Sequence, residues 1–122
     1  MGKIDFAVEF QQRTKRFAID VIMMYRKLPK TEDARIVGRQ ILKSATSVAS
    51  NYRAACRSRS DKEFYSKLSI VVEEADETVF WMEIITESNI YKVDEALLKE
   101  ANEILSVVAR SRKTLRNKIS EL

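Results

Sequence analysis

Residues 60–85 have the sequence SDKEFYSKLSIVVEEADETVFWMEII, which contains a helix start followed by an uninterrupted helical pattern. Ser60 and Glu63 have the spacing of a capping box, in which the serine hydroxyl accepts a hydrogen bond from the Glu63 amide and the glutamate reaches back. Side chains that suit a helix contact then alternate by four and three positions, which is the pattern of bundle packing. They are Phe64, Leu68, Val71, Ala75, Thr78, Met82 and Ile85.

Two helices are predicted before this one. The first should cover residues 5–28 and end at Pro29, because the residue before a proline disfavours helical geometry. Its apolar stripe is Phe6, Phe10, Phe17, Val21, Met24 and Leu28. The second should start after Thr31, a residue type that caps helices. Its stripe is Ala34, Ile41, Ala45, Val48, Tyr52 and Cys56. Gly38 lies within this stripe, and we interpret it as the site of a close helix contact.

The fourth helix is predicted to start at Asp94, which caps it. Its seam is Leu97, Ala101, Ile104, Val108, Ser111 and Leu115. The connections are short, so neighbouring helices should run antiparallel. A chain of 122 residues suits one core. We therefore predict a single all-α domain, residues 1–122, folded as an antiparallel up-and-down four-helix bundle.

The composition excludes several other classes of protein. Two glycines and one proline are too few for a β-rich chain with many tight turns. No apolar run reaches the roughly 20 residues that cross a bilayer, so we expect no membrane partner. The N-terminus lacks a signal-peptide pattern. Cys56 is the only cysteine, which excludes an intrachain disulfide and fits a cytoplasmic protein.

Some large apolar residues lie away from the predicted core stripes. At about 100° per residue, Ile19, Ile22 and Met23 fall on the far side of the first helix. Ile70, Trp81 and Ile84 do the same on the third helix, and Phe80 also lies outside its seam. Scattered surface hydrophobes are one interpretation. The other, which we favour because large residues cluster on two helices, is an interface between copies of the chain.

Charge is distributed unevenly along the chain. The net charge is +4, with residues 1–61 contributing +7 and residues 62–122 contributing −3. A basic stripe lies on one flank of the second helix and continues into the next loop: Arg35, Arg39, Lys43, Arg53, Arg57 and Arg59. This stripe could bind phosphates, or it could pair with the acidic face of the third helix formed by Glu73, Asp76, Glu77, Glu83 and Glu87. Gln40, Ser44, Ser47 and Asn51 form a neutral stripe on the other flank, which either lines a helix contact or faces water.

The chain has no histidine, which excludes a Ser-His-Asp triad, a Cys-His pair and an imidazole base. A tetrahedral Cys/His zinc site cannot form either. The carboxylates of Glu73, Glu74, Asp76 and Glu77 diverge around their helix, which favours a solvated face over a metal site. Cys56 lies on the core side of its helix, so we interpret it as a packing residue. We therefore expect no enzyme, no metal and no cofactor.

Three motifs resemble a known family. They are QILKSATSVASNYRAA at residues 40–55, SDKEF at residues 60–64 and EADETVFWM at residues 74–82. Together they are similar to the bacterial four-helix-bundle proteins related to the product of the 23S rRNA intervening sequence, over residues 17–90. The resemblance implies an all-helical fold and a homo-oligomeric ring of five subunits. A distant branch is the basic accessory protein of diversity-generating retroelements, which works with nucleic acid. Residues 53–56, Arg-Ala-Ala-Cys, depart from the acidic residue followed by glycine that many relatives have there.

Two function hypotheses follow. The first is a non-enzymatic oligomer that binds RNA or another nucleic acid through the basic stripe, holding phosphates without reading bases. The second is a scaffold whose oligomer presents helical surfaces to a protein partner and has no nucleic-acid role. In both, the first partner of the chain is a second copy of itself.

Overall fold

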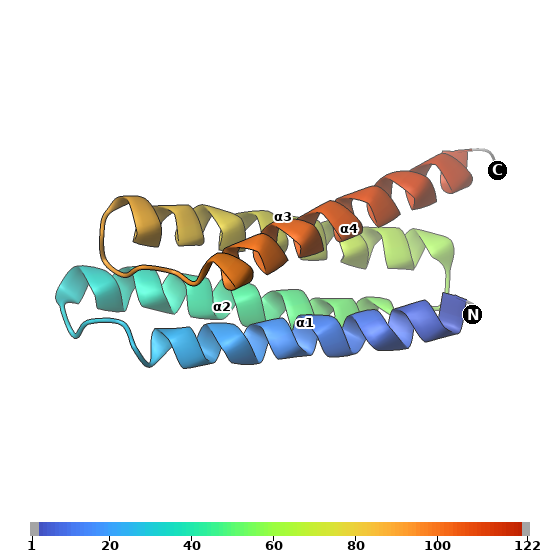
Figure 1. Cartoon of the computed structure of the whole chain (residues 1–122). Coiled ribbons are helices and arrows are strands. Elements are labelled where there is room, and N and C mark those ends of the chain that lie inside the picture. The colour runs from blue at the N-terminus through green and yellow to red at the C-terminus, as the bar shows by residue number, and fades with distance from the viewer. Residues whose placement is uncertain (1–2, 121–122) are drawn as a thin grey trace.

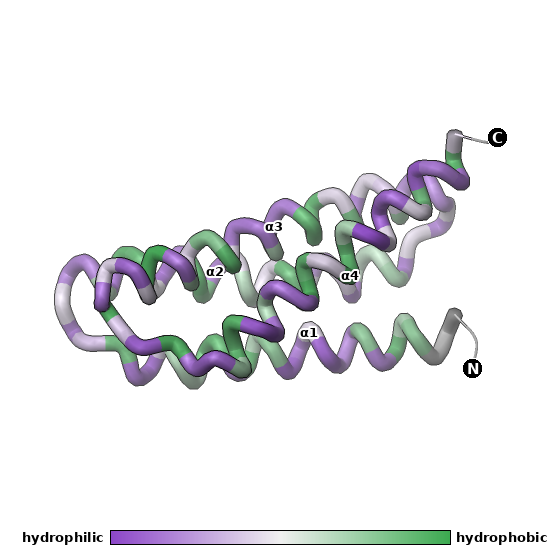
Figure 2. Tube along the Cα trace, turned by 45° about the horizontal axis from the view of Figure 1, so that its top comes forward, coloured by the Kyte–Doolittle hydropathy of each residue, from purple (hydrophilic) through white to green (hydrophobic). Residues whose placement is uncertain are grey.

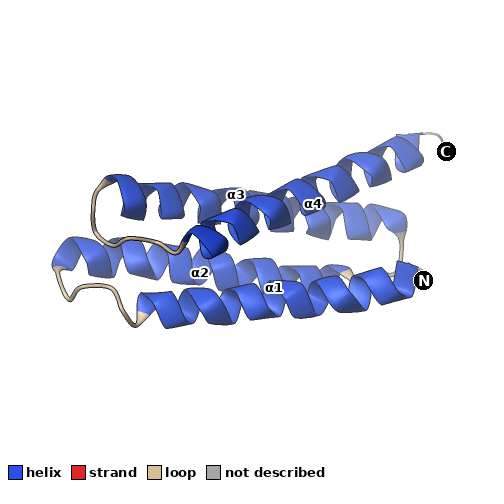
Figure 3. Ribbon diagram, in the orientation of Figure 1, coloured by secondary structure: helices blue, strands red, loops and turns tan. Residues whose placement is uncertain are grey.

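The computed structural model describes residues 3–120, which form four helices packed as a bundle (Figure 1). The helices are α1 Lys3–Tyr25, α2 Glu32–Ala55, α3 Asp61–Glu87 and α4 Glu95–Ser120. Their three connecting loops lie at alternating ends of the molecule, and no strand occurs among residues 3–120 (Figure 3). The predicted all-helical fold with four helices is confirmed. Within this same range, no helix has the length and apolar character to cross a membrane.

Each helix contributes its predicted seam to one core. Apolar and polar residues alternate along all four helices (Figure 2), and most of the predicted seam residues are buried. On α3, the six residues from Leu68 to Ile85 in the four-three pattern are at most 2% exposed. On α4, Ala101, Ile104, Val108 and Leu115 are buried, whereas Leu97 and Ser111 are half-buried. The periodicity therefore predicted the core almost residue by residue.

The predicted caps form, with one exception. Thr31 Oγ1 accepts a hydrogen bond from the Ala34 amide at the start of α2, and Asp94 Oδ1 accepts one from the Ala96 amide before α4. Ser60 Oγ accepts from the Glu63 amide over 3.1 Å, as the capping box requires. The second predicted contact of the capping box, from the Glu63 side chain back to the start of the helix, is wrong. The Glu63 carboxylate instead forms an ion pair with Lys67, one turn later in the helix.

The end of α1 differs from the prediction. The helix ends at Tyr25, three residues before Leu28, because the Lys27 and Leu28 amides bond to the carbonyls of Met24 and Tyr25 in a tight turn. Leu28 nevertheless stays buried, as its place in the stripe predicted. It lies against Gly38, where an added Cβ would be 3.0 Å from Leu28 Cδ1 and 3.0 Å from Tyr25 Cε1. The close helix contact predicted at Gly38 is therefore present.

Phe6 is the one predicted core residue of the first stripe that the structure places outside the core. It is 50% exposed and stacks on Phe10, with ring centroids 5.7 Å apart. The cause is the course of α4, which diverges from α1 toward this end of the bundle (Figures 1 and 2). No fourth helix covers Phe6 there, so the stripe ends at Phe10.

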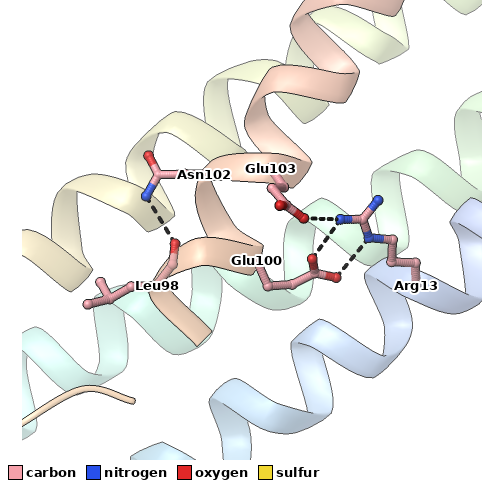
Figure 4. Close-up of polar contacts among 5 residues, drawn as sticks. All are labelled: Arg13, Leu98, Glu100, Asn102 and Glu103. Atoms are coloured by element: carbon pink, nitrogen blue, oxygen red, sulfur yellow. Dashed lines mark hydrogen bonds and ion pairs between the residues drawn. The ribbon is translucent and has the colours of Figure 1, made fainter. Parts of the chain in front are cut away.

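Helix contacts follow chain order: α1 packs on α2, α2 on α3 and α3 on α4, while α4 meets α1 over a smaller area. Arg13 of α1 strengthens this last contact (Figure 4) by binding Glu100 with two hydrogen bonds of 2.7 and 2.8 Å and Glu103 with one of 2.9 Å. Within residues 3–120, the backbones of α1 and α3 do not come close to each other, so these two helices lie diagonally across the bundle.

Candidate nucleic-acid interface

The six residues of the predicted basic stripe are all exposed. Arg35, Arg39, Lys43 and Arg53 lie on α2, whose register places residues four apart on one side of the helix. Arg57 was predicted to be helical, but α2 ends at Ala55, so Arg57 lies with Arg59 in the loop to α3. The loop keeps the stripe continuous, because the Arg57 amide still bonds to the Ala54 carbonyl in a turn.

No residue of the basic stripe forms an ion pair with any acidic side chain among residues 6–120, whose side chains the structure describes. The ion pairs that do form involve other residues. Arg13 pairs with Glu100 and Glu103. Lys67 pairs with Glu63, and Lys118 with Asp61. The predicted alternative, pairing with the acidic face of α3, is thus not seen in the part of the chain described. The stripe presents its charge to solvent.

Lys43 differs from the other five residues because it lies beside α3. Its charge acts on Glu74, whose pKa is raised above the ordinary value by burial, then by repulsion from Glu77, and lowered in part by Lys43. Glu74 Oε2 is buried and has no hydrogen-bond partner within the described range. A carboxylate in this position is held in an unfavourable environment.

The neutral stripe of α2 is divided between two environments. Ser44 is fully buried against Thr78 of α3, whereas Gln40 is exposed. Ser47 and Asn51 are half-buried. The side-chain amide of Asn51 donates a hydrogen bond of 2.9 Å to the Ser47 carbonyl of its own helix. The helix contact predicted for this stripe is therefore centred on Ser44, and the end near Gln40 faces water.

The predicted interface residues lie on two separate sides of the bundle. On α1, Ile19 and Met23 are 40% and 47% exposed, and Ile22 is half-buried. On α3, Ile70 is 44% exposed, while Trp81 and Ile84 are half-buried. Trp81 follows Thr78 by three residues, about 60° around the helix, so it lies beside the α2 contact and not opposite the core.

The structure adds three exposed apolar residues to this set. Phe80, which the sequence had placed outside the seam, is exposed and meets Trp81 edge to face at 4.9 Å between ring centroids. Val8 on α1 and Ile36 on α2 are also exposed and were missed. Val8 lies eleven residues before Ile19, three turns of helix, and this spacing was the signal available in the sequence.

Two basic residues of α1 were also missed. Lys15 and Arg53 line the same groove between α1 and α2, and Arg16 adjoins it. The sequence showed both α1 residues on the outer side of their helix. It did not show which α2 residues they would meet, because that depends on the pairing of the two helices.

Cys56 is half-buried at the end of α2, in accord with the predicted packing role. Burial raises the pKa of its thiol, partly offset by hydrogen bonds with Tyr52 and Gln11. A raised pKa lowers the fraction of reactive thiolate at neutral pH. Among the side chains of residues 6–120, no three metal-ligating groups come together.

Comparisons with known proteins agree with this architecture. A family model described as "23S rRNA-intervening sequence protein" matches residues 7–110. No curated protein matches the chain. Among solved structures, the chain is similar to a protein with unknown function from the S23 ribosomal protein family of Bacteroides thetaiotaomicron. The two are 27% identical, with a TM-score of 0.77, and the match covers 84% of this chain and 97% of the other.

Proposed function

The chain belongs to the 23S rRNA-intervening sequence protein family, and from this premise we propose that it is a non-enzymatic, homo-oligomeric RNA-binding protein. The basic stripe of α2 holds the phosphates of RNA. The subunits, each an antiparallel up-and-down bundle, assemble through α1 and α3 into a ring of five.

The observation that carries RNA binding is the state of the basic stripe. Six cationic side chains run along one side of the molecule, all exposed, and none forms an ion pair with an acidic side chain among residues 6–120. Exposed arginines and lysines in a row attract the regularly spaced phosphates of a nucleic acid. Contacts of this kind position a strand without reading its bases.

Assembly is supported by the two apolar faces. The α1 face contains Ile19, Ile22 and Met23, and the α3 face contains Ile70, Trp81 and Ile84. Because α1 and α3 lie diagonally across the bundle, the two faces lie on helices that do not adjoin, with the α3 face beside the α2 contact. Pairing the α1 face of one subunit with the α3 face of the next gives a heterologous contact, the type of contact that builds a ring when the rotation between neighbouring subunits closes.

Polar atoms on α3 favour the same conclusion. Trp81 Nε1 and Glu74 Oε2 are both buried without a hydrogen-bond partner in residues 3–120. Buried polar groups in folded proteins almost always have such partners. A neighbouring subunit against the α3 face can supply them after small side-chain rotations.

RNA binding is tested by measuring the affinity of the purified protein for a fluorescent single-stranded RNA at several salt concentrations. We expect affinity to fall steeply with salt, with a slope near −4 on logarithmic axes if all six cations contact phosphates. The variant Arg39→Glu/Arg53→Glu/Arg57→Glu should lose binding at low salt. The matched control Arg110→Glu/Lys113→Glu/Arg116→Glu makes the same change of charge on exposed positions of α4 and should retain it.

Equal loss in both triple variants would mean that only overall charge matters, and the role of the stripe would be rejected. Absence of RNA binding by the unaltered protein would reject the function itself. Protein partners that stay bound to the unaltered protein after nuclease digestion, in the absence of RNA binding, would support the scaffold function instead.

A further inference from the structure

A groove lies between α1 and α2, on the side of the bundle that carries the basic stripe. It has a volume of about 470 Å³. Gln11, Gln12 and Lys15 form the wall on α1. Thr46, Ala49, Ser50 and Arg53 of α2 form the opposite wall, together with Arg57 of the loop that follows. A second hollow of about 410 Å³ shares Gln12 and Lys15 with it and adds Arg16 and Ile19. The two hollows are therefore continuous along α1.

We propose that this groove is the binding track for the phosphate backbone of single-stranded RNA. Lys15 of α1 lines it together with Arg53 of α2 and Arg57 of the following loop, and Arg16 of α1 lines the adjoining hollow. The inference rests on the proposed function and specifies its site. It adds two residues of α1 to the basic stripe. It also distinguishes the two ends of that stripe: Arg53 and Arg57 line the groove, whereas Arg35 and Arg39 do not.

Charge complementarity supports this occupant. All four charged side chains that line the two hollows are positive, and no acidic residue lines either one. Arg13, on the same part of α1, shows the contrasting case: its guanidinium is bound to Glu100 and Glu103 on the α4 side. Lys15 and Arg16 form no ion pair with any side chain of residues 6–120, so their charge is available to the two hollows.

The shape of the groove favours a single strand over a duplex. Packed helices have axes about 8–10 Å apart, so a groove between them is narrower than a nucleic-acid double helix. Its floor contains Ala49 and Ser50, short side chains that let a strand lie low between the longer basic ones. Arg53 lies in the last turn of α2 and Arg57 in the loop just after it, which spaces the two cations along the groove.

The groove has no means of reading bases by stacking. None of the residues that line the two hollows is aromatic, and stacking platforms require aromatic faces. The remaining polar groups, the amides of Gln11 and Gln12 and the hydroxyl of Ser50, suit hydrogen bonds to phosphate or ribose oxygens. We therefore expect binding that depends on salt and little on sequence.

The test compares three double variants with the unaltered protein, using fluorescent oligo(U) and oligo(A) of the same length. Lys15→Glu/Arg16→Glu and Arg53→Glu/Arg57→Glu should each weaken binding at least tenfold at low salt. The control Arg110→Glu/Lys113→Glu should bind within about threefold of the unaltered protein. Light scattering on each variant ensures that a loss of affinity is not a loss of assembly, because Ile19 lies at the end of the groove.

The dependence of RNA affinity on salt concentration is a second measurement, and a folding defect alone is not expected to change it in the same way. Removing two phosphate contacts from a single strand should reduce the logarithmic slope by about 1.4. A further comparison is Arg35→Glu/Arg39→Glu, which changes the other end of α2. It should weaken binding less than Arg53→Glu/Arg57→Glu, since neither of its residues lines the groove.

Failure of this inference differs from failure of the proposed function. If Lys15→Glu/Arg16→Glu binds RNA like the unaltered protein while the α2 variants do not, the groove is rejected and the function stands. A strong preference between oligo(U) and oligo(A) also overturns the groove, since no base-reading group lines it. If the unaltered protein binds neither RNA, both proposals are rejected together.

Discussion

Thr78 Oγ1 of α3 lies 2.9 Å from Ser44 Oγ of α2, and both side chains are fully buried. Each hydroxyl also reaches a carbonyl of its own helix: Thr78 that of Glu74 at 2.8 Å, and Ser44 that of Ile41 at 3.2 Å. The two hydroxyl groups have one proton each but make three contacts: one with each other and one each with a carbonyl. One hydroxyl therefore donates to the other. This pair fixes the register between α2 and α3, the most extensive helix contact in the described part of the bundle.

Removal of either hydroxyl should destabilise the protein moderately. We expect Ser44→Ala and Thr78→Val each to cost about 1 kcal/mol of unfolding free energy, because the remaining hydroxyl keeps only its carbonyl partner. The double variant should cost less than the sum, since neither hydroxyl is then left behind. Urea unfolding of all four proteins measures this. Strictly additive losses would show that the two groups do not interact.

Substitution of Gly38 tests the close contact between α1 and α2. A Cβ there meets Leu28 and Tyr25 at 3.0 Å, so Gly38→Val should cost about 1–3 kcal/mol through overpacking. Gly38→Ala should cost less, because its higher helix propensity of about 1 kcal/mol offsets part of the strain. Thermal unfolding measures both. Ser50→Val, at an exposed position of the same helix, is the control, and a Gly38→Val protein as stable as this control would contradict the prediction.

Assembly through two different faces makes a specific prediction for mixtures. Ile19→Glu/Met23→Glu disables the α1 face, and Trp81→Glu/Ile84→Glu disables the α3 face. Each variant alone should be monomeric by light scattering at micromolar concentration, because neither has a complementary pair of faces. Mixed in equal amounts, they should form a heterodimer and nothing larger, through the one remaining pair of intact faces.

The same mixture excludes the symmetric alternative. If α1 faces paired with α1 faces, the α3 variant alone would still dimerise, and mixing would add nothing. If the unaltered protein is monomeric at micromolar concentration, the proposed interface is rejected.

Glu74 should make stability depend on pH. Its pKa is raised in the folded protein, chiefly by burial and then by Glu77, so the folded state binds a proton more tightly than the unfolded state. Stability attributable to this group therefore rises as the pH falls through its titration range and is lost toward neutral pH.

Glu74→Gln should accordingly stabilise the protein at pH 7. The gain should shrink as the pH falls, because Glu74 then becomes neutral without substitution. Urea unfolding between pH 4 and 7 checks this. Glu73→Gln, an exposed neighbour on the same helix, is the control, and equal behaviour of the two variants would argue against the assigned cause.

Local features made most of the fold predictable. The caps at Thr31, Ser60 and Asp94 and the four-three seams each involve residues within one or two turns, so they can be recognised without knowledge of the rest of the chain. Phe6 was misplaced for the opposite reason. Its pattern matched the core stripe, but its exposure is determined by the course of α4, which begins almost ninety residues later.

The basic stripe illustrates the same division within the candidate site. The spacing of Arg35, Arg39 and Arg53 correctly predicted a common exposed side of α2. It did not predict that Lys43 would lie near Glu74, or that Arg53 would share a groove with Lys15. Those relationships depend on how α2 is rotated against α1 and α3.

The amino-acid sequence by itself determined four amphipathic helices, their starts and the side chains that close the core, because hydrogen bonds along a helix and its 3.6-residue period are local. The tertiary structure alone decided which charged side chains share a groove and which apolar faces remain uncovered. The physical reason is that helix packing brings together residues such as Lys15 and Arg53, whose proximity depends on the rotation and register of two packed helices.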